Sequence, residues 1–202
     1  MTRTFNYQRF YDRLSVIYAQ AVYLLPMWRR YTEAVLPHLP DEGAILELGP
    51  GPGMLHRKLA AQYAFVTGLD LSPGMLRQSR LRLQRAELPV RLVRGNVVRL
   101  PLAAASFDGI ALTFMFSAVP DGQDAMNEIA RCLRPGGVVA LVDACNPDNG
   151  NRFARGLAWL WERFGDFMRD EGALMQAAGL AVVERREFGA FNSIRLTVGR
   201  KN

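Results

Sequence analysis

Hydrophobic and polar positions divide the chain from residue 44 onward into segments with two different periods. Short apolar runs such as 45–48 and 138–145 are typical of strands that are buried on both faces of a sheet. Between these runs, apolar residues recur at every third or fourth position, as on one face of a helix. Ser72 and Asp121 are expected to cap two of these helices, and residues 135–137 are expected to form a turn before the last of these strands. This alternation predicts an α/β fold with a doubly wound, mostly parallel sheet. The strands expected in this part are 45–48, 65–71, 90–94, 107–116 and 138–145.

The C-terminal part of the chain has a different pattern. Residues 152–164 and 170–178 are expected to be helical, and strands are expected at 180–188 and 192–200. Because only three residues join these two strands, they should pair antiparallel.

Two amphipathic helices are expected before the first strand. Apolar residues fall at helical spacing over residues 8–24, and a second helix begins at Pro26, where a missing N–H costs little. With 202 residues, half of them hydrophobic, the chain can form one domain with a full core. We expect a single domain, 1–202, made of an N-terminal helical cap (1–40), a cofactor-binding core (44–145), a helical substrate segment (146–179) and a C-terminal strand pair (180–202).

The sequence shows no signal for a membrane span or a metal site. It has no apolar run of roughly 18 residues, and its polar N-terminus lacks the apolar centre of a signal peptide, so we expect a cytoplasmic protein. Cys132 and Cys145 fall in a predicted helix and strand and are expected to be buried free thiols. His38 and His56 lie far apart, which leaves a zinc ion without a ligand set.

The net charge of +6 comes almost entirely from arginines, many of them between residues 77 and 99. A basic surface can bind nucleic acid, an anionic membrane or an acidic substrate. A solvated helix face is the commoner origin of such a run, and it is the interpretation that we favour.

A glycine-rich turn follows the first strand, with Gly49, Gly51 and Gly53 at every second position. Glycine permits positive φ and leaves backbone N–H groups open to a ligand. The G-x-G-x-G spacing differs from the G-x-G-x-x-G of dinucleotide-binding proteins. Glu47, near the end of the strand, suits a positively charged ligand better than a phosphate. A tight turn that binds nothing is the alternative.

Polar residues also lie at the ends of the next three strands. Asp70 ends the second strand, where a carboxylate can bind the ribose hydroxyls of an adenosine group. Asn96 follows the third strand and can accept a hydrogen bond from the adenine amino group, and Thr113 lies near the end of the fourth. Because carboxyl ends of parallel strands share one edge, we expect these residues and Glu47 to line one site. For Asp70 alone, helix entry is an equally good explanation.

These motifs resemble those of the class I S-adenosylmethionine-dependent methyltransferases, over residues 44 to 200. Segment 47–53 is similar to the first motif of that family, and segment 68–76 is similar to the second, with Asp70 at the ribose position. The terminal antiparallel strand pair is also typical of the family. Further matching segments are 95–96, 100–102, 106–108 and 133–137.

The resemblance implies a seven-stranded, Rossmann-like sheet in the order 3-2-1-4-5-7-6 with an antiparallel last strand. It also implies S-adenosyl-L-methionine as the cofactor, with Glu47 at its ammonium group and Asp70 at its ribose. The expected cofactor-binding residues are Glu47, Gly49, Gly51, Gly53, Asp70, Leu71, Met75, Asn96, Val97 and Thr113. Tyr11 is the candidate catalytic residue, closing over the cofactor, and packing on an amphipathic helix is the alternative.

Within the family, the chain is similar to the ubiquinone/menaquinone-biosynthesis group (methyltransferase type 11/25) and to related lipid and small-molecule methyltransferases. Tyr11-Asp12 and Trp28-Arg29-Arg30 resemble the start of that group. Asn96 stands where the family commonly has an acid. Ser117-Ala118 stands where many relatives carry a histidine pair, so a histidine base is excluded at that point.

The expected activity is methyl transfer to a small-molecule or lipid-like acceptor, such as a quinone, phospholipid, thiol or phenol. The helix pair and the aromatic residues of 159–164 are expected to wall the acceptor site, and core packing is the alternative for them. Peripheral membrane contact agrees with a lipid acceptor, and binding of nucleic acid is not expected.

Two other functions stay open. A nucleic-acid methyltransferase would agree with the arginines, but residues 113–116 lack the Asn-Pro-Pro-aromatic signature of such enzymes. The third function is that of a non-catalytic S-adenosylmethionine-binding protein, because a fold alone does not decide an activity.

Overall fold

The computed structural model describes residues 26–148, 153, 156, 159, 162 and 167–202. Its strands are β1 (Ala44–Leu48), β2 (Phe65–Asp70), β3 (Leu92–Arg94), β4 (Phe107–Thr113), β5 (Leu133–Ala144), β6 (Leu180–Phe188) and β7 (Ile194–Lys201). Its helices are α2 (Pro26–Glu33), α3 (Met54–Gln62), α4 (Pro73–Arg85), α5 (Gly122–Cys132) and α7 (Glu171–Ala177).

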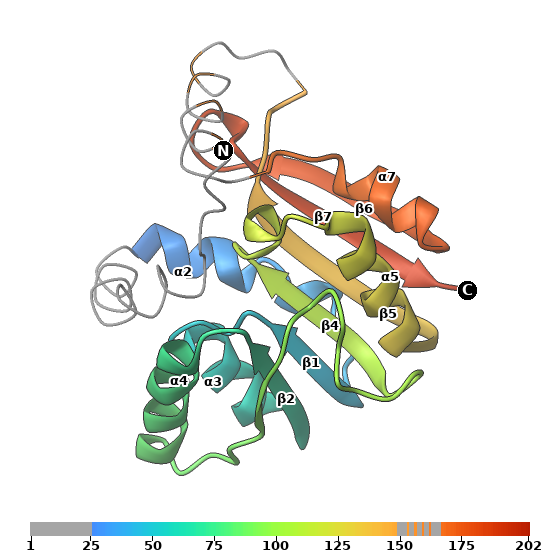
Figure 1. Ribbon diagram of the computed structural model, residues 1–202. Coiled ribbons are helices and arrows are strands. Elements are labelled where there is room, and N and C mark those ends of the chain that lie inside the picture. Colours follow the sequence, from blue (N-terminus) through green and yellow to red (C-terminus); the bar gives the residue numbers. More distant parts are fainter. Residues whose placement is uncertain (1–25, 149–152, 154–155, 157–158, 160–161, 163–166) are drawn as a thin grey trace, which may run out of the picture.

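The seven strands form one sheet in the order β3-β2-β1-β4-β5-β7-β6 (Figure 1). β7 runs antiparallel to both of its neighbours, β5 and β6, and the other adjacent pairs are parallel. The α/β class, the strand order and the antiparallel last strand expected from the sequence are therefore confirmed.

Two apolar clusters cover the two faces of the sheet. On one face, α5 and α7 pack over residues such as Leu46 and Leu112. On the other face, α3 packs over residues such as Ile45 and Ala111. Neighbouring residues of one strand thus contribute to opposite clusters, as the two-residue period of a strand requires. The continuous apolar runs in the sequence follow from burial on both faces.

β4 is shorter than expected, because the chain turns sharply after Thr113. Phe114 adopts a left-handed backbone with φ +51°, and a 3-10 turn follows at Phe116–Ala118. The expected strand over 107–116 is therefore three residues too long. This early end brings the Phe114 side chain to the edge of the sheet where ligands bind in such folds.

Of three helix and strand boundaries expected from the sequence, the structure confirms one. Ser72 caps α4 as predicted, since its hydroxyl accepts a hydrogen bond from the Met75 N–H at 3.2 Å. Asp121 stands at the N-cap of α5, but its side chain makes no capping hydrogen bond. The expected turn at 135–137 lies inside β5, where the register with β4 is irregular.

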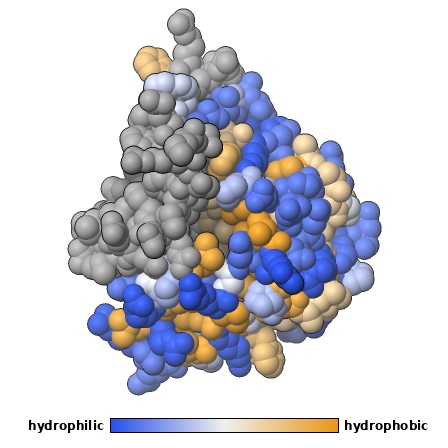
Figure 2. Space-filling view, viewed as in Figure 1, coloured by the Kyte–Doolittle hydropathy of each residue, from blue (hydrophilic) through white to orange (hydrophobic). Residues whose placement is uncertain are grey.

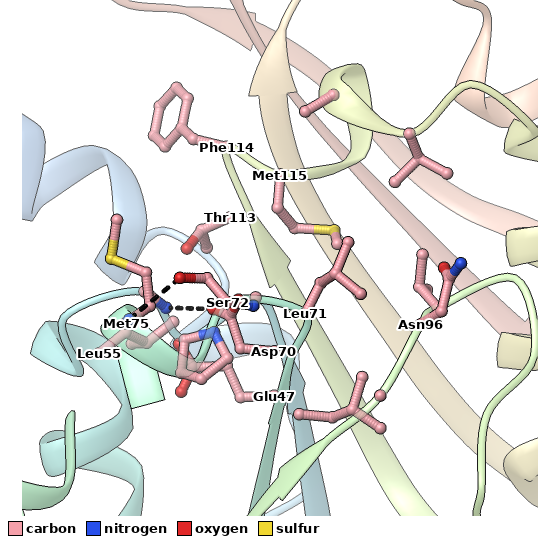
Figure 3. Close-up of a pocket in the computed structure, with 18 of the residues that line it drawn as sticks. Glu47, Leu55, Asp70, Leu71, Ser72, Met75, Asn96, Thr113, Phe114 and Met115 are labelled. Atoms are coloured by element: carbon pink, nitrogen blue, oxygen red, sulfur yellow. Dashed lines mark hydrogen bonds between the residues drawn. The ribbon is translucent and has the colours of Figure 1, made fainter. Parts of the chain in front are cut away.

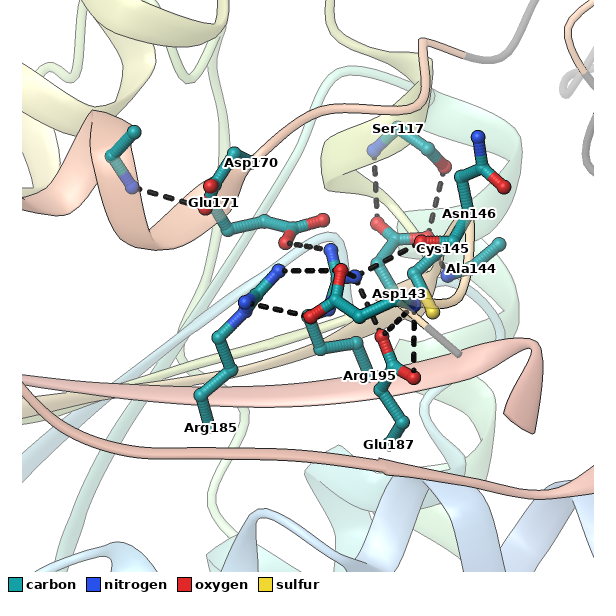
Figure 4. Close-up of polar contacts among 12 residues, drawn as sticks. Ser117, Asp143, Ala144, Cys145, Asn146, Asp170, Glu171, Arg185, Glu187 and Arg195 are labelled. Carbon is teal, nitrogen blue, oxygen red and sulfur yellow. Dashed lines mark hydrogen bonds and ion pairs between the residues drawn. The ribbon is translucent and has the colours of Figure 1, made fainter. Parts of the chain in front are cut away.

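Arg195 on β7 ties the segment after β5 to the sheet (Figure 4). The side chain is only 3% exposed, and its Nη2 donates to Glu187 Oε1 at 2.7 Å and to Asp148 Oδ1 at 3.1 Å. Its Nη1 lies 3.3 Å from Oε2 of Glu171, the first residue of α7. The same guanidinium also donates to the Asn146 carbonyl at 3.0 Å. These contacts fix the point where the chain leaves the sheet.

Cys132 and Cys145 are buried free thiols, as expected, and burial raises the pKa of Cys145 to about 12. Within the described part of the chain, no helix is long and apolar enough to cross a bilayer. The expected helix over 8–24, and most of the expected helix over 152–164, lie outside the described residues.

Arginines of α4 extend into solvent. Arg77, Arg80 and Arg85 are exposed, whereas Arg82 turns inward and donates to the Pro52 carbonyl at 2.6 Å. Figure 2 shows hydrophilic and hydrophobic residues intermixed on the part of the surface where α4 lies. This arrangement agrees with a solvated helix face.

Candidate functional site

A cavity of about 500 Å³ opens at the carboxyl ends of β1, β2 and β4 (Figure 3). Ligands of doubly wound folds bind at this edge of the sheet. Nine of the ten expected cofactor-binding residues line the cavity, and only Gly53 does not. The nine are Glu47, Gly49, Gly51, Asp70, Leu71, Met75, Asn96, Val97 and Thr113. The two carboxylates expected to share one hollow therefore do so.

The glycine turn presents bare backbone to this cavity. Gly49 and Gly51 adopt left-handed backbones, with φ +66° and +52°. The Gly49 N–H donates to the Leu69 carbonyl at 2.8 Å, which ties the turn to β2. A Cβ atom at Gly51 would meet no atom within 4 Å, so the space beside this residue is open to a ligand.

Gly53 lies behind the cavity wall. It precedes α3 with φ +83°, and a Cβ atom at this position would lie 2.5 Å from Ser79 Oγ on α4. The missing side chain therefore lets α3 and α4 pack closely. This packing accounts for Gly53 without any contact to a ligand.

Asp70 orders the turn at the end of β2. Its Oδ2 accepts a hydrogen bond from the Gly51 N–H at 3.1 Å, and its Oδ1 accepts one from the Ser72 N–H at 2.9 Å. A carboxylate oxygen can accept more than one hydrogen bond, so the same group can also bind a ribose. Ser72 rather than Asp70 caps α4, but Asp70 holds the N–H of this capping residue, so helix entry stays an alternative explanation for the carboxylate.

Glu47 is buried beneath the turn and contacts a histidine. Its side chain is 1% exposed, and its Oε2 lies 2.8 Å from Nδ1 of His56, which is fully buried on α3. Sequence reasoning missed His56, because a lone histidine on a predicted helix carries no signal of its partner. A polar pair thus lies at the base of the cavity.

Apolar side chains and Asn96 form the wall beside β2 and β3. Met75 and Val97 are buried, and Leu71 is half-exposed at the rim. The Asn96 Oδ1 accepts a hydrogen bond from the Val98 N–H at 3.2 Å, so the oxygen expected at adenine also orders its own loop. Apolar side chains next to an amide suit a planar, apolar group with polar edges.

The opposite wall is aromatic. Trp28 of α2 stacks on Phe114, with ring centroids 4.2 Å apart and an interplanar angle of 26°. Both residues line the cavity, as does Met115, which occupies the space that a side chain at Gly49 would need. A positive φ at a bulky residue such as Phe114 is rare and marks strain that is common at functional sites. Sequence reasoning expected the N-terminal helix pair to wall the site, but it missed Phe114 because it placed this residue inside a strand.

Some expected site residues cannot be located. Tyr11, Trp161 and Phe164 lie outside the described residues. Phe153 and Trp159 are described, and both are strongly exposed, at 78% and 62%. The catalytic role of Tyr11 and the aromatic wall of 159–164 therefore stay predictions.

Asp121 is a further carboxylate in the lining of the cavity, at its exposed rim. Sequence reasoning assigned it only a helix-capping role, which left no reason to place it in the site. Among the described residues, no group of three or more His, Cys, Asp or Glu side chains is arranged to hold a metal ion.

Residues 46–141 match the methyltransferase domain family. A demethylmenaquinone methyltransferase from Mycobacterium sp. (strain KMS) is 35% identical over 122 residues, which is 60% of this chain and 50% of that protein. One from Listeria welshimeri is 39% identical over 84 residues, 41% of this chain and 36% of that protein. The chain thus spans between about a third and a half of the length of these curated relatives.

A solved structure of a S-adenosylmethionine-dependent methyltransferase from Thermotoga maritima, described as a possible histamine N-methyltransferase, has a similar fold. Its TM-score is 0.75 at 20% identity, over 96% of this chain and 99% of that chain. The match over residues 46–141 and the strand order with its antiparallel β7 lead to one conclusion. The chain is similar to the methyltransferase domain family over residues 46–141 and to an S-adenosylmethionine-dependent methyltransferase in its fold, and S-adenosylmethionine is the cofactor that these similarities imply.

Proposed function

We propose that this protein transfers a methyl group from S-adenosylmethionine to a small-molecule or lipid-like acceptor. The supporting observation is a single cavity with Glu47, Asp70 and open glycine backbone at one end and the Trp28–Phe114 pair at the other. Its volume of about 500 Å³ lies within the range of small-molecule sites. Glu47 beside the glycine turn attracts a cationic ligand and repels a pyrophosphate, and Asp70 can bind a ribose, so this donor set fits S-adenosylmethionine.

Each part of the lining has a proposed role toward the cofactor. Glu47 binds the ammonium group, the glycine backbone binds the methionine carboxylate, and Asp70 binds the ribose. The adenine ring lies against the apolar wall, where an amide can meet its amino group. The residues proposed for this wall are Leu71, Met75, Asn96 and Val97, and Thr113 lines the cavity at the end of β4.

The cofactor supplies a methyl group that is already activated on a sulfonium. The protein's own residues therefore need to hold the two reactants in line and exclude water. Trp28 and Phe114 cover the acceptor side, and Tyr11 stays our candidate for closing over the cofactor. The described lining contains no histidine, lysine or cysteine, which favours an acceptor that needs little help from a base.

For the acceptor, we propose a quinol or a similarly acidic phenol. Two observations support this choice: the curated relatives are demethylmenaquinone methyltransferases, and the cavity has an aromatic wall on which a ring can stack. The exposed arginines of α4 suit peripheral contact with an anionic membrane, where lipid-soluble quinols reside.

A methyl-transfer screen tests both the proposed reaction and the proposed class of acceptor. Radiolabelled S-adenosylmethionine is incubated with demethylated quinols, phospholipids, thiols, phenols and RNA, with and without anionic vesicles. We expect label in the quinol fraction, with Phe114→Leu lowering that incorporation while leaving cofactor affinity close to wild type. Label confined to RNA would contradict the acceptor class and favour a nucleic-acid methyltransferase.

A second candidate function is use of the cofactor pocket without methyl transfer. The [4+2]-cyclase SpnF shares this fold, with a TM-score of 0.77 at 15% identity over 96% of this chain and 94% of that chain. The fold by itself therefore does not determine the reaction. Tight cofactor binding without label in any acceptor of the screen would favour this candidate.

A further inference from the structure

A glycine on β2 makes room for the histidine that contacts Glu47. Glu47 on β1 is paired in register with Gly68 on β2, so the side-chain positions of these two residues lie side by side on one face of the sheet. A Cβ atom at Gly68 would lie 2.8 Å from His56 Cε1 and 3.1 Å from His56 Nδ1. The imidazole of α3 thus occupies the place of the missing Gly68 side chain.

Only one of the two ring nitrogens of His56 has a hydrogen-bond partner among the described residues. Its Nδ1 lies 2.8 Å from Glu47 Oε2, whereas its Nε2 is buried and has no hydrogen-bond partner among the described residues. A buried N–H without an acceptor is unfavourable, but a bare ring nitrogen leaves no donor unsatisfied. The contacts therefore favour a neutral imidazole with its proton on Nδ1, donating to Glu47.

A neutral donor has a specific consequence for the cavity. A hydrogen bond from neutral imidazole holds Oε2 of Glu47 in place but does not cancel the charge of the carboxylate. A protonated imidazolium would neutralise the pair and remove its attraction for a cation. Glu47 is among the residues that line the cavity, so the remaining charge acts on whatever binds there.

We propose that His56 is a positioning residue that holds Glu47 as an anion for the amino-acid end of the cofactor, an inference that rests on the proposed function. Gly68 supports the same Glu47–His56 contact because it provides the space for the ring. The specificity of the site for ligands with a cationic amino group then depends on a residue that need not touch the ligand.

Binding of two ligands that both have an uncharged sulfur can distinguish this positioning role from simple packing. S-adenosylhomocysteine carries the amino-acid end of the cofactor, and methylthioadenosine lacks it. We expect His56→Phe to weaken binding of S-adenosylhomocysteine about tenfold or more while changing the affinity for methylthioadenosine less than about twofold. Asparagine places an amide donor near the Nδ1 position, so His56→Asn should restore most of the difference. Calorimetric titration measures all of these affinities.

The outcomes are distinct. If His56→Phe weakens both ligands equally, or neither, His56 only packs and the inference is overturned. If the wild-type protein binds both ligands with equal affinity, the amino-acid end is not recognised, and the inference fails while a nucleoside site survives. If it binds neither ligand, the proposed cofactor itself is wrong, and the inference fails with it.

A measurement on the wild-type protein avoids any folding defect of the variants. The chain contains only two histidines, His38 and His56, so nitrogen NMR of the imidazole rings can be assigned with a His38→Gln control. We expect His56 to show a protonated Nδ1 and a bare Nε2 near neutral pH. A proton on Nε2, or on both nitrogens, would overturn the inference.

Discussion

At the scale of single residues, the Asp70 side chain orders the turn after β2 and also has a proposed role in binding. It accepts hydrogen bonds from the N–H groups of Gly51 and Ser72, at 3.1 and 2.9 Å, and it is our candidate for the ribose. Asp70→Ala should weaken binding of S-adenosylhomocysteine about 100-fold, because hydrogen bonds to charged groups contribute roughly 1.5–3 kcal/mol each. Calorimetric titration of the two proteins measures the change.

A second substitution separates these tasks. In Asp70→Asn, the amide oxygen can still accept one backbone N–H, but the charge is lost. We expect an intermediate loss of about tenfold with little change in the stability of the unliganded protein. Affinity close to wild type in Asp70→Ala would contradict the placement of the ribose.

Burial governs the ionisation of Glu171. Removal from water raises the pKa of its carboxyl group to about 7, although the guanidinium of Arg195 opposes this rise. Arg195 makes closer contacts with Glu187 and Asp148, at 2.7 and 3.1 Å, than the 3.3 Å contact with Glu171. Its charge is thus shared among three carboxylates, which leaves Glu171 incompletely compensated for its burial.

Glu171→Gln should therefore change the pH dependence of stability. Because the folded protein holds this proton more tightly than the unfolded chain, Glu171 loses its stabilising effect as the pH rises from about 4.5 to about 7. Relative to the glutamine variant, the free energy of unfolding of wild type should fall by on the order of 3 kcal/mol across this range and should not fall further above it. Urea unfolding of both proteins from pH 4 to pH 8 measures the difference, and a constant difference would contradict the raised pKa.

At the scale of elements, the contact between α3 and α4 depends on Gly53. The residue has φ +83°, and a Cβ atom would lie 2.8 Å from the backbone Cα of Ser79 as well as 2.5 Å from its Oγ. Gly53→Ala therefore adds a backbone clash to the strain of a left-handed alanine. We expect a loss of roughly 2–4 kcal/mol in the free energy of unfolding, measured by urea titration.

Gly179 provides a matched control for this substitution. It follows α7 with φ +81°, nearly the same as Gly53, but a Cβ atom there would meet nothing within 4 Å. Gly179→Ala should lose only about 1–2 kcal/mol, from the left-handed backbone alone. Equal losses in the two variants would show that the contact with Ser79 is unimportant.

The sequence predicts an element well when the local pattern of apolar residues determines it. Burial on both faces makes β1 and β5 continuous apolar runs, so the sequence alone predicts them. The early end of β4 was missed, because nothing in the local sequence indicates a positive φ at Phe114. Asp121 was assigned from capping preference, whereas its side chain makes no capping bond and lies at the cavity instead.

At the scale of the whole molecule, the two ends of the cavity differ in how far the sequence could predict them. The carboxylate end follows from strand ends that must meet at one edge of a parallel sheet, so Glu47 and Asp70 could be placed together in advance. The aromatic wall joins α2 to the turn after β4, and the contact between Trp28 and Phe114 comes from packing between segments far apart in sequence. His56 likewise required the register of β1 and β2 to be known.

Ligand binding should be visible in the stability of the whole fold. A ligand that binds only the folded state at about 100 times its Kd stabilises it by about 2.7 kcal/mol. For a chain of this size, that corresponds to a rise in Tm of roughly 5–10 °C. We expect this rise with S-adenosylhomocysteine, and none with NADH at the same concentration, because Glu47 lies beside the glycine turn and repels a pyrophosphate there. Thermal unfolding followed by fluorescence measures both shifts; stabilisation by NADH alone would mean that the pocket holds a dinucleotide.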